Sequence, residues 1–343
     1  MANNVADILY QADENYAFVL AVSLRSFFEN NKDVLFNTVI IDCGMSPESR
    51  EKLSNMALSL GRRISFLNGD ELAGKYFGKG FGANVTYRAN KKSYYKIMYP
   101  CLEMAAERIL YIDCDTVVSG SVKPLLEMPL EGKIMAAAYD SNTDAVIKRK
   151  LGISSGEPYY NSGVMVINKK EWNRHHVFER ILKYNEKGLK FNTVDQTYIN
   201  LAVKGKAVLL DCRYNLQPWH RVFKAEDYLS VYRKHDSYYS KEELEAAKAS
   251  PVIIHFFRYL GRHPWDKDSM HPDEKLFRKW LKLTPWADME PKKKDIGFFI
   301  KIERVLYRIL PGKLFLIFFR LTKMAYNVFW KIKRMIFGDS NGK

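Results

Sequence analysis

Short apolar runs alternate with helical patterns along the first part of the chain, and this alternation limits the folds open to it. Asp7–Ala12 and Val34–Asp42 have the composition of strands, and the segment between them repeats apolar residues at helical spacing. Pro47–Leu60 follows as a helix, Arg63–Leu67 as a strand and Ser93–Glu107 as a helix. Elements in this order predict an α/β fold with a mostly parallel twisted sheet flanked by helices.

The next apolar run, Ile109–Ile112, ends in two carboxylates, Asp113 and Asp115. Side chains at i and i+2 of an extended segment point the same way, so this pair can converge on one hard cation. The crevice beyond the carboxyl ends of the strands is where open α/β sheets bind ligands. An acidic turn that caps the following helix is the alternative, and it is the commoner role of an isolated Asp-x-Asp.

Other polar residues stand where predicted elements begin or end. They are Asp140 after a strand, Asn161 and Gly163 before one, Asp195 and Gln196 in the first turn of a helix, and His255 at the end of an apolar run. Each also has an ordinary structural interpretation. Asn161 suits a turn, Asp195 suits the dipole of a helix N-terminus, and a histidine at a strand end usually packs in the core or at the surface.

Positive charge is concentrated near the C-terminus. The formal net charge is +15, and residues 291–343 contain 13 lysine or arginine residues but three acids, which is +10 of that total. A basic, aromatic tail also suits a nucleic-acid-binding protein, the alternative from a different class. Because the rest of the chain is only mildly basic and its strand ends are acidic, we expect no nucleic-acid partner.

The four cysteines are scattered, with no Cys-x-x-Cys pair, which argues against a zinc site or a disulfide framework and favours a reducing compartment. The first residues lack the basic and then apolar pattern of a signal peptide. No run approaches the ~18 apolar residues of a membrane span. We therefore expect a cytoplasmic protein.

Several motifs occur together in one order: ADENY, ILYIDCD, YYNSGVMVIN, VDQTYIN, and IIH followed by Gly-x-His-Pro-Trp. In this the sequence resembles the family 8 retaining glycosyltransferases, which include bacterial lipooligosaccharide galactosyl- and glucosyltransferases and glycogenin. The resemblance implies a GT-A fold over residues 1–270 that binds a UDP-sugar together with Mn²⁺ or Mg²⁺. Residues 271–343 are then a separate basic, aromatic and helical tail.

The resemblance also assigns roles to individual residues. It implies that the metal ligands are Asp113, Asp115 and His255. It implies that the donor is bound by Asp13, Asn15, Tyr16, Lys96, Asn161 and Gly163. It places Asp195 and Gln196 beside the reacting carbon and Asp140 near donor or acceptor. Since a neutral amide is a poor nucleophile, we expect retention by same-face attack, in which the departing phosphate takes the acceptor proton.

The chain departs from the family pattern after His255. The family commonly has a glycine three residues after this histidine and a lysine before Pro-Trp that binds the diphosphate. Here the interval to Gly261 is longer, and His263 stands in place of the lysine. The resemblance still places Gly261 and His263 at the donor, but a neutral histidine donates only one hydrogen bond, so Arg258 or Arg262 is the alternative contact to the diphosphate.

The C-terminal tail has an amphipathic helical pattern. One arc holds Lys313, Arg320, Lys323, Asn327, Lys331 and Arg334, and the opposite surface holds Phe315, Phe318, Tyr326, Phe329, Trp330 and Phe337. This pattern predicts a helix that lies in the interface of an anionic membrane, so we expect peripheral association with the inner face of the cell membrane. A terminal helix pair packed on the catalytic domain is the alternative.

The resemblance implies a retaining hexosyltransferase that moves glucose or galactose from a UDP-hexose to a glycan or glycolipid acceptor. The location at the membrane favours a lipid-linked or cell-envelope glycan. A protein-linked glycan is the alternative acceptor, because it would use the same donor site.

Overall fold

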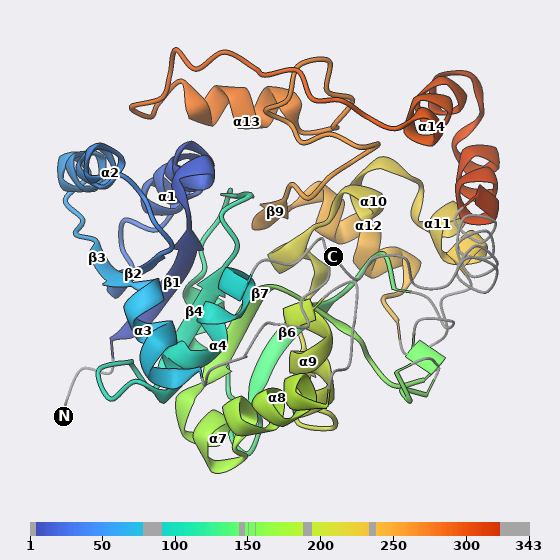
Figure 1. Ribbon diagram of the computed structural model, residues 1–343. Coiled ribbons are helices and arrows are strands. Elements are labelled where there is room, and N and C mark those ends of the chain that lie inside the picture. The colour runs from blue at the N-terminus through green and yellow to red at the C-terminus, as the bar shows by residue number, and fades with distance from the viewer. Residues whose placement is uncertain are drawn as a thin grey trace.

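The computed structural model describes residues 5–77, 91–143, 148–149, 151–154, 156–187, 194–232 and 238–322. A seven-stranded sheet with the order β3-β2-β1-β4-β7-β6-β8 forms the centre of the molecule (Figure 1). Its strands are β1 (Ala6–Ala12), β2 (Phe36–Asp42), β3 (Ser65–Asn68), β4 (Arg108–Ile112), β6 (Met135–Tyr139), β7 (Tyr160–Asn168) and β8 (Ala207–Leu209). Two further strands, β5 (Thr116–Val118) and β9 (Ile253–His255), form a small separate sheet.

Most neighbouring strands of the large sheet are parallel. β1 pairs in parallel with β2 and β4, β2 with β3, and β6 with β8, whereas β7 runs antiparallel to both β4 and β6. The predicted α/β fold with a mostly parallel sheet is therefore confirmed.

Helices cover both faces of this sheet and bury alternate residues of its strands. On one face, Ile8 and Tyr10 pack with α1 (Ala17–Asn30) and α2 (Pro47–Ser59). On the other, Leu9 faces the cluster formed by α3 (Gly69–Tyr76), α4 (Tyr95–Met98), α7 (Lys169–Arg174), α8 (Val177–Glu186) and α9 (Val194–Ala202). Further helices of the described residues are α5 (Lys123–Glu127), α10 (Pro218–Val222), α11 (Ala225–Tyr232), α12 (Lys241–Ala249), α13 (Glu274–Leu281) and α14 (Phe298–Ile309).

The predicted helix over Ser93–Glu107 is wrong. The segment contains α4 between two short 3-10 turns, η2 (Lys91–Tyr94) and η3 (Tyr99–Cys101), and then continues without helix to β4. Pro100 has no N–H to continue the helical hydrogen bonds. The buried carboxylate of Asp7 also accepts from the hydroxyl of Tyr99 at 2.8 Å and from the backbone N–H of Ala106 at 2.6 Å, which holds the irregular chain against β1.

The described C-terminal segment packs on the same core. Phe277 of α13 is fully buried and meets Phe18 of α1 edge to face, with 6.3 Å between the ring centroids. A helix over residues 312–322 lies beside α11 (Figure 1). Phe315, which we predicted on a lipid-facing surface, is instead fully buried and stacks on Phe223, the apolar residue directly after α10. Phe318 is half-buried, Lys313 lies 3.9 Å from Asp227, and Arg320 donates to the carbonyl of Val231, so these predicted tail residues also contact the chain. The predicted residues beyond position 322 lie outside the described residues.

None of the helices described between residues 5 and 322 has the length and apolar character needed to cross a membrane.

Candidate active site

A cavity of about 320 Å³ opens where β1 and β4 end. This volume is in the usual range for small-molecule sites. Its lining includes Asp13, Tyr16, Lys96, Asp113, Asp115 and Asp195, residues from four separate parts of the chain. The predicted crevice at the carboxyl ends of the strands therefore exists, and it gathers acidic, basic and aromatic groups.

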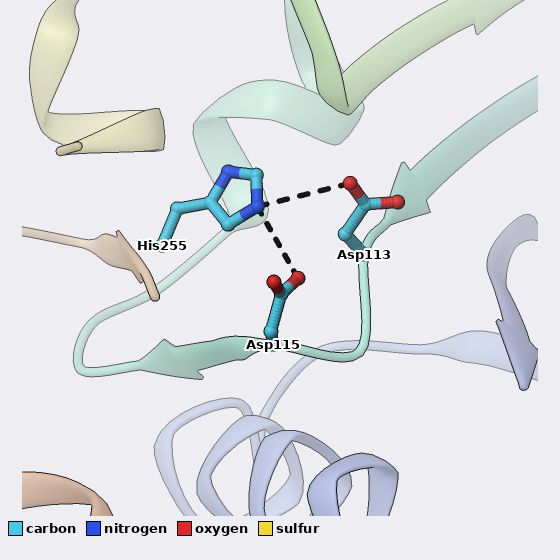
Figure 2. Close-up of side chains that lie close together, drawn as sticks. All are labelled: Asp113, Asp115 and His255. Carbon is cyan, nitrogen blue, oxygen red and sulfur yellow. Dashed lines mark ion pairs between the residues drawn. The ribbon is translucent and has the colours of Figure 1, made fainter. Parts of the chain in front are cut away.

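Asp113 and Asp115 line this cavity, and the side chain of His255 points toward both of them (Figure 2). The Nε2 atom of His255 lies 3.7 Å from Oδ2 of Asp113 and 3.2 Å from Oδ1 of Asp115. Potential ligand atoms of all three residues lie within 4.8 Å of one another. Asp113 and Asp115 precede His255 by about 140 positions in the sequence. The fold nevertheless brings the three side chains into one cluster, as the resemblance led us to expect.

The small β5–β9 sheet brings the cluster together. Thr116 pairs with His255 in the antiparallel register, so the chain that leaves Asp115 runs directly beside the histidine. A polar stripe on α1 holds β5 in place: Ser23 shares a hydrogen bond of 2.7 Å with the hydroxyl of Thr116, and Ser26 accepts from the N–H of Val118 at 2.9 Å. α1 therefore helps to position the candidate ligands through β5.

The residues present fit a divalent cation. Two carboxylates and one imidazole form a mixed oxygen and nitrogen set that suits Mn²⁺ or Mg²⁺. Gly163 provides the room, since a Cβ at this position would stand 2.3 Å from Cε1 of His255 and 2.7 Å from Oδ2 of Asp113. Any larger residue would therefore push the candidate ligands apart.

Burial and the charges of neighbouring side chains shift the pKa values of Asp113, Asp115 and His255. Burial raises the pKa of Asp113, and the nearby Lys96 only partly opposes this rise. Burial alone would also raise the pKa of Asp115, but attraction to His255 outweighs it and lowers the pKa. Burial alone would lower the pKa of His255, and the two carboxylates more than reverse this effect. The cluster therefore favours a positive charge between the two acids.

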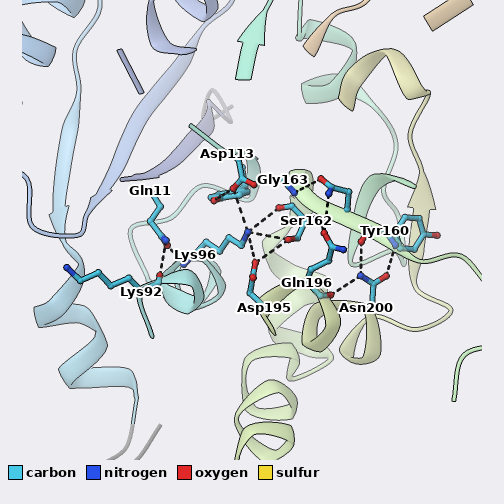
Figure 3. A network of polar contacts seen from close by, with 12 residues as sticks. Gln11, Lys92, Lys96, Asp113, Tyr160, Ser162, Gly163, Asp195, Gln196 and Asn200 are labelled. Carbon is cyan, nitrogen blue, oxygen red and sulfur yellow. Dashed lines mark hydrogen bonds and ion pairs between the residues drawn. The ribbon is translucent and has the colours of Figure 1, made fainter. Parts of the chain in front are cut away.

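Lys96 joins this cluster to Asp195 (Figure 3). Its Nζ atom lies 2.8 Å from Oδ2 of Asp195 and 3.8 Å from Oδ1 of Asp113, and it stands 4.5 Å above the ring of Tyr111. Lys96 is only 5% exposed. Burial lowers its pKa, but the two carboxylates reverse this and raise the pKa, so Lys96 is a buried ammonium shared by two acids.

Gln196 is held in one orientation by its neighbours. Its Oε1 atom accepts from the backbone N–H of Ser162 at 3.1 Å and from Nδ2 of Asn161 at 3.2 Å. Its Nε2 atom donates to Oδ2 of Asp140 at 3.3 Å. The other oxygen of Asp140 accepts from the N–H of Asn142 at 2.9 Å. The amide oxygen of Gln196 thus already receives two hydrogen bonds.

The turn after β1 presents Asp13 and Tyr16 to the cavity, whereas Asn15 is exposed and is not part of the lining. Oδ1 of Asp13 accepts from the N–H of Tyr16 at 3.2 Å and so caps the short η1 turn (Glu14–Tyr16). Glu14, which we had not singled out, accepts from the N–H of Ser46 at 2.7 Å. This bond anchors the turn to the N-terminus of α2.

The structure separates the two residues predicted after His255. Gly261 has a left-handed φ of 80°, and a Cβ there would stand 2.6 Å from Cγ2 of Ile300, so this glycine faces α14 and not the cavity. His263 is buried, and its Nε2 atom accepts from Nε of Arg258 at 3.1 Å. Burial lowers the pKa of His263 to about 4 and keeps the imidazole neutral.

The structure also discriminates between the two alternative arginines. Arg262 is buried and donates from Nη1 to the carbonyl of Lys267 at 2.7 Å. Arg258 is exposed, and its positive charge partly opposes the rise that burial causes in the pKa of Tyr16. Arg258 is therefore the arginine on the side of the cavity.

Comparison with known proteins agrees with this arrangement. The model of the family described as Glycosyl transferase family 8 matches residues 7–269. The chain belongs to this family. The family 8 assignment establishes the enzyme class, so the protein is a glycosyltransferase of the hexosyltransferase type, and both the resemblance and the enzyme class predicted from the sequence are confirmed.

Similar proteins align over most of this family 8 chain. General stress protein A of Bacillus subtilis (strain 168) is 26% identical over 294 residues, which is 83% of this chain and 96% of the relative. A lipopolysaccharide 1,2-glucosyltransferase of Escherichia coli (strain K12) is 24% identical over 293 residues, 83% of this chain and 80% of the relative. The crystal structure of the galactosyltransferase LgtC with donor and acceptor sugar analogs matches with a TM-score of 0.62 and 23% identity, over 81% of this chain and 96% of that one. The shared fold is GT-A.

Asn215 is the main residue that sequence reasoning missed. It is fully buried, and its side chain contacts both His255 and Asn161. It stands in the turn Cys212–Asn215, where an asparagine has no distinguishing pattern, so only the folded chain reveals its position.

Proposed function

We propose that this family 8 enzyme transfers glucose or galactose from a UDP-sugar to a lipid-linked or cell-envelope glycan with retention of configuration. Asp113, Asp115 and His255 would hold Mn²⁺ or Mg²⁺ against the diphosphate. The observation that carries the proposal is the convergence of these three side chains beside a cavity whose lining includes Asp113 and Asp115 together with Tyr16 and Lys96.

The donor would lie along this cavity. Tyr16 offers an aromatic face for the uracil, and the unused carboxylate oxygen of Asp13 can accept from a base N–H. A bound divalent cation supplies Lewis-acid stabilisation of the leaving diphosphate, worth several kcal/mol by general estimates. Arg258, oriented by the lone pair of His263, would add a second positive charge on the side where the family has a lysine.

The contacts of Gln196 favour same-face attack over a covalent intermediate on this residue. A glutamine oxygen that receives two hydrogen bonds has its lone pairs occupied and is a weaker nucleophile. Asp195 is paired with the ammonium of Lys96, which also reduces its nucleophilicity. The residues Asp140, Asn161 and Gln196 would instead orient the sugar, and the departing phosphate would take the acceptor proton.

The acceptor and the location are inferred from the C-terminal segment and from the relatives. Exposed apolar side chains lie along α14 and helix 312–322: Phe298, Phe299, Ile302, Val305, Ile309, Leu314, Ile317 and Leu321. Lys301 and Arg308 stand exposed on α14 beside them. An apolar face flanked by cations suits the interface of an anionic membrane. Several relatives are named as lipopolysaccharide glucosyltransferases, which act on an envelope glycolipid.

We accordingly assign residues 1–270 to the catalytic unit and residues 271–343 to a tail that holds it on the cytoplasmic face of the membrane. The tail reaches the catalytic unit through α13 and Phe315, so it would also fix the orientation of the cavity relative to the bilayer.

Hydrolysis of a panel of UDP-sugars, with and without Mn²⁺, tests the proposal. We expect the native chain to release UDP from one or two of these donors only when the cation is present, and Asp115→Asn to lose at least about 100-fold in rate. Asp33→Asn, at an exposed acid that is not among the residues lining the cavity, is the matched control. Equal turnover by the native chain and Asp115→Asn would remove the metal site.

A further inference from the structure

The turn that carries Asn215 is held beside β9 by backbone hydrogen bonds. The N–H of Leu216 donates to the carbonyl of Ile253 at 2.8 Å, and the N–H of His255 donates to the carbonyl of Leu216 at 3.0 Å. This pairing places the fully buried side chain of Asn215 against the ring of His255, on the side away from the carboxylates. The ring nitrogen that faces Asn215 is Nδ1, and Figure 2 shows that it points away from Asp113 and Asp115.

A backbone N–H determines how the buried amides are oriented. The N–H of Gly163 can only donate, and it lies 3.0 Å from Oδ1 of Asn161, so the atom of Asn161 at this place must be the oxygen. The same oxygen lies 2.9 Å from the amide of Asn215, which must therefore present its NH₂ group here. The opposite end of the Asn215 amide, the oxygen, then faces Nδ1 of His255 at 3.0 Å.

This orientation determines the tautomer of the histidine. An amide oxygen accepts only, so Nδ1 of His255 carries a proton and donates it to Asn215. The lone pair of the neutral imidazole is then on Nε2, which is the atom directed at Asp113 and Asp115. A hydrogen bond to the second ring nitrogen of a ligating histidine orients the ring and makes it a better ligand.

We propose that Asn215 is a positioning residue for the candidate metal site, and that the series Gly163–Asn161–Asn215–His255 transmits the order of the sugar pocket to the metal ligand. This inference rests on the proposed function, because it concerns the cation that Asp113, Asp115 and His255 would hold. It goes further by giving a role to a residue outside the predicted set. It also gives Asn161 a second role, since Asn161 bonds Gln196 on one side and Asn215 on the other.

Binding of Mn²⁺ to the full chain without any nucleotide tests the inference, with the free ion measured by electron paramagnetic resonance. Asn215→Leu keeps the volume but removes the acceptor, and Asn215→Ala removes it with a smaller side chain in case leucine prevents folding. We expect both to weaken Mn²⁺ binding by roughly 10- to 100-fold. Asn215→Asp retains an acceptor for Nδ1–H but turns a second oxygen toward Oδ1 of Asn161, so we expect its Mn²⁺ affinity to lie between those of Asn215→Ala and the native chain.

The outcomes separate this inference from the proposed function. If the native chain binds Mn²⁺ and the affinity of Asn215→Ala or Asn215→Leu is within about 3-fold of the native affinity, Asn215 has only a structural role and the inference is wrong. Loss of binding in Asn215→Asp equal to that in Asn215→Ala would also overturn it. If the native chain itself binds neither Mn²⁺ nor Mg²⁺, the proposed metal site fails first. Asn161→Ala should weaken Mn²⁺ binding in the same nucleotide-free assay, although Asn161 is not one of the candidate ligands.

Discussion

Two regions of the molecule differ in how completely their polar groups are hydrogen-bonded and their apolar groups buried. They are the shell of buried amides formed by Asn161, Gln196 and Asn215, and the segment from residue 256 to 322. In the shell, the side-chain amides of Asn161, Gln196 and Asn215 are buried and each receives or donates hydrogen bonds within the chain. In the later segment, Nδ1 of His263 is buried without a hydrogen-bond partner among the described residues. The same segment leaves Phe298 70% and Phe299 66% exposed.

The polar groups of the shell are satisfied by hydrogen bonds within the chain, whereas the later segment has apolar and polar groups that a binding partner could cover or pair. A fully bonded polar shell holds its groups in place before any ligand arrives, which is how enzymes reduce the cost of reorganisation during reaction. Exposed aromatic residues and an unpaired buried donor carry a cost that a partner can offset. This difference is consistent with the roles proposed above, in which the shell orients the sugar and the later segment binds the diphosphate and the membrane.

The strongest way to break the shell is Gly163→Ala. The added Cβ would stand 2.3 Å from Cε1 of His255, so His255 and Asp113 must move apart. We expect Mn²⁺ affinity to fall about 100-fold and overpacking to cost about 1–3 kcal/mol in the free energy of unfolding. Titration calorimetry with Mn²⁺ measures the first effect. Gly74→Ala, where a Cβ meets open space, is the control, and native affinity in Gly163→Ala would contradict the role of this glycine.

Arg258→Ala tests whether the later segment contacts the diphosphate. A charge-assisted hydrogen bond is worth about 1.5–3 kcal/mol, so the dissociation constant of UDP should rise by roughly 10- to 100-fold. Uridine, which lacks phosphate, should bind both proteins equally. The exposed Arg63→Ala serves as the control. An equal loss for uridine and UDP would show that Arg258 acts on the nucleoside instead.

His271→Asn tests how the buried His271 makes the stability of the folded chain depend on pH. Burial lowers the pKa of His271 from 6.5 to about 3, so the unfolded chain takes up a proton below pH 6.5 and the folded chain does not. The stability that this group contributes is present above pH 6.5 and is lost as the pH falls toward 3. At pH 5 the loss is about 2 kcal/mol.

In His271→Asn this part of the loss should disappear, while an amide oxygen at the place of Nδ1 can still accept from the N–H of Asp273. Urea denaturation at pH 7 and pH 5 gives the comparison. Burial raises the pKa of Asp273 to about 6, which has the opposite pH dependence, but Asp273 is present in both proteins and its effect cancels. An equal loss of stability in both proteins would contradict the prediction.

The smallest expected effect concerns the exposed face of α14. Phe298→Ser combined with Phe299→Ser should weaken binding to vesicles that contain anionic lipid by roughly 10-fold, because less apolar surface enters the interface. Hydrolysis of the donor in solution should not change. Leu35→Ser, at a residue that is 74% exposed in a loop, is the matched control in a sedimentation assay. If the double variant binds vesicles as the native chain does, α14 is not part of the membrane contact.

The fold class and the identity of the candidate ligands could be inferred from the sequence. Apolar runs at strand spacing, alternating with helical patterns, specify a parallel sheet, because each pattern buries an apolar face only in that arrangement. The acids after β4 could be recognised because the polar residues directly follow an apolar strand. The order of the motifs then supplied His255, although nothing local distinguishes this histidine.

Tertiary structure decided which long-range partners these residues meet. Asn215 and Phe315 are ordinary residues in their local sequence, and the structure places them through contacts with the distant His255 and Phe223. The segment Ser93–Glu107 failed as a helix for the same reason, because the distant Asp7 captures its backbone and side chains. Periodicity reports which face of an element is buried, but hydrogen bonds between distant segments depend on how those faces are assembled.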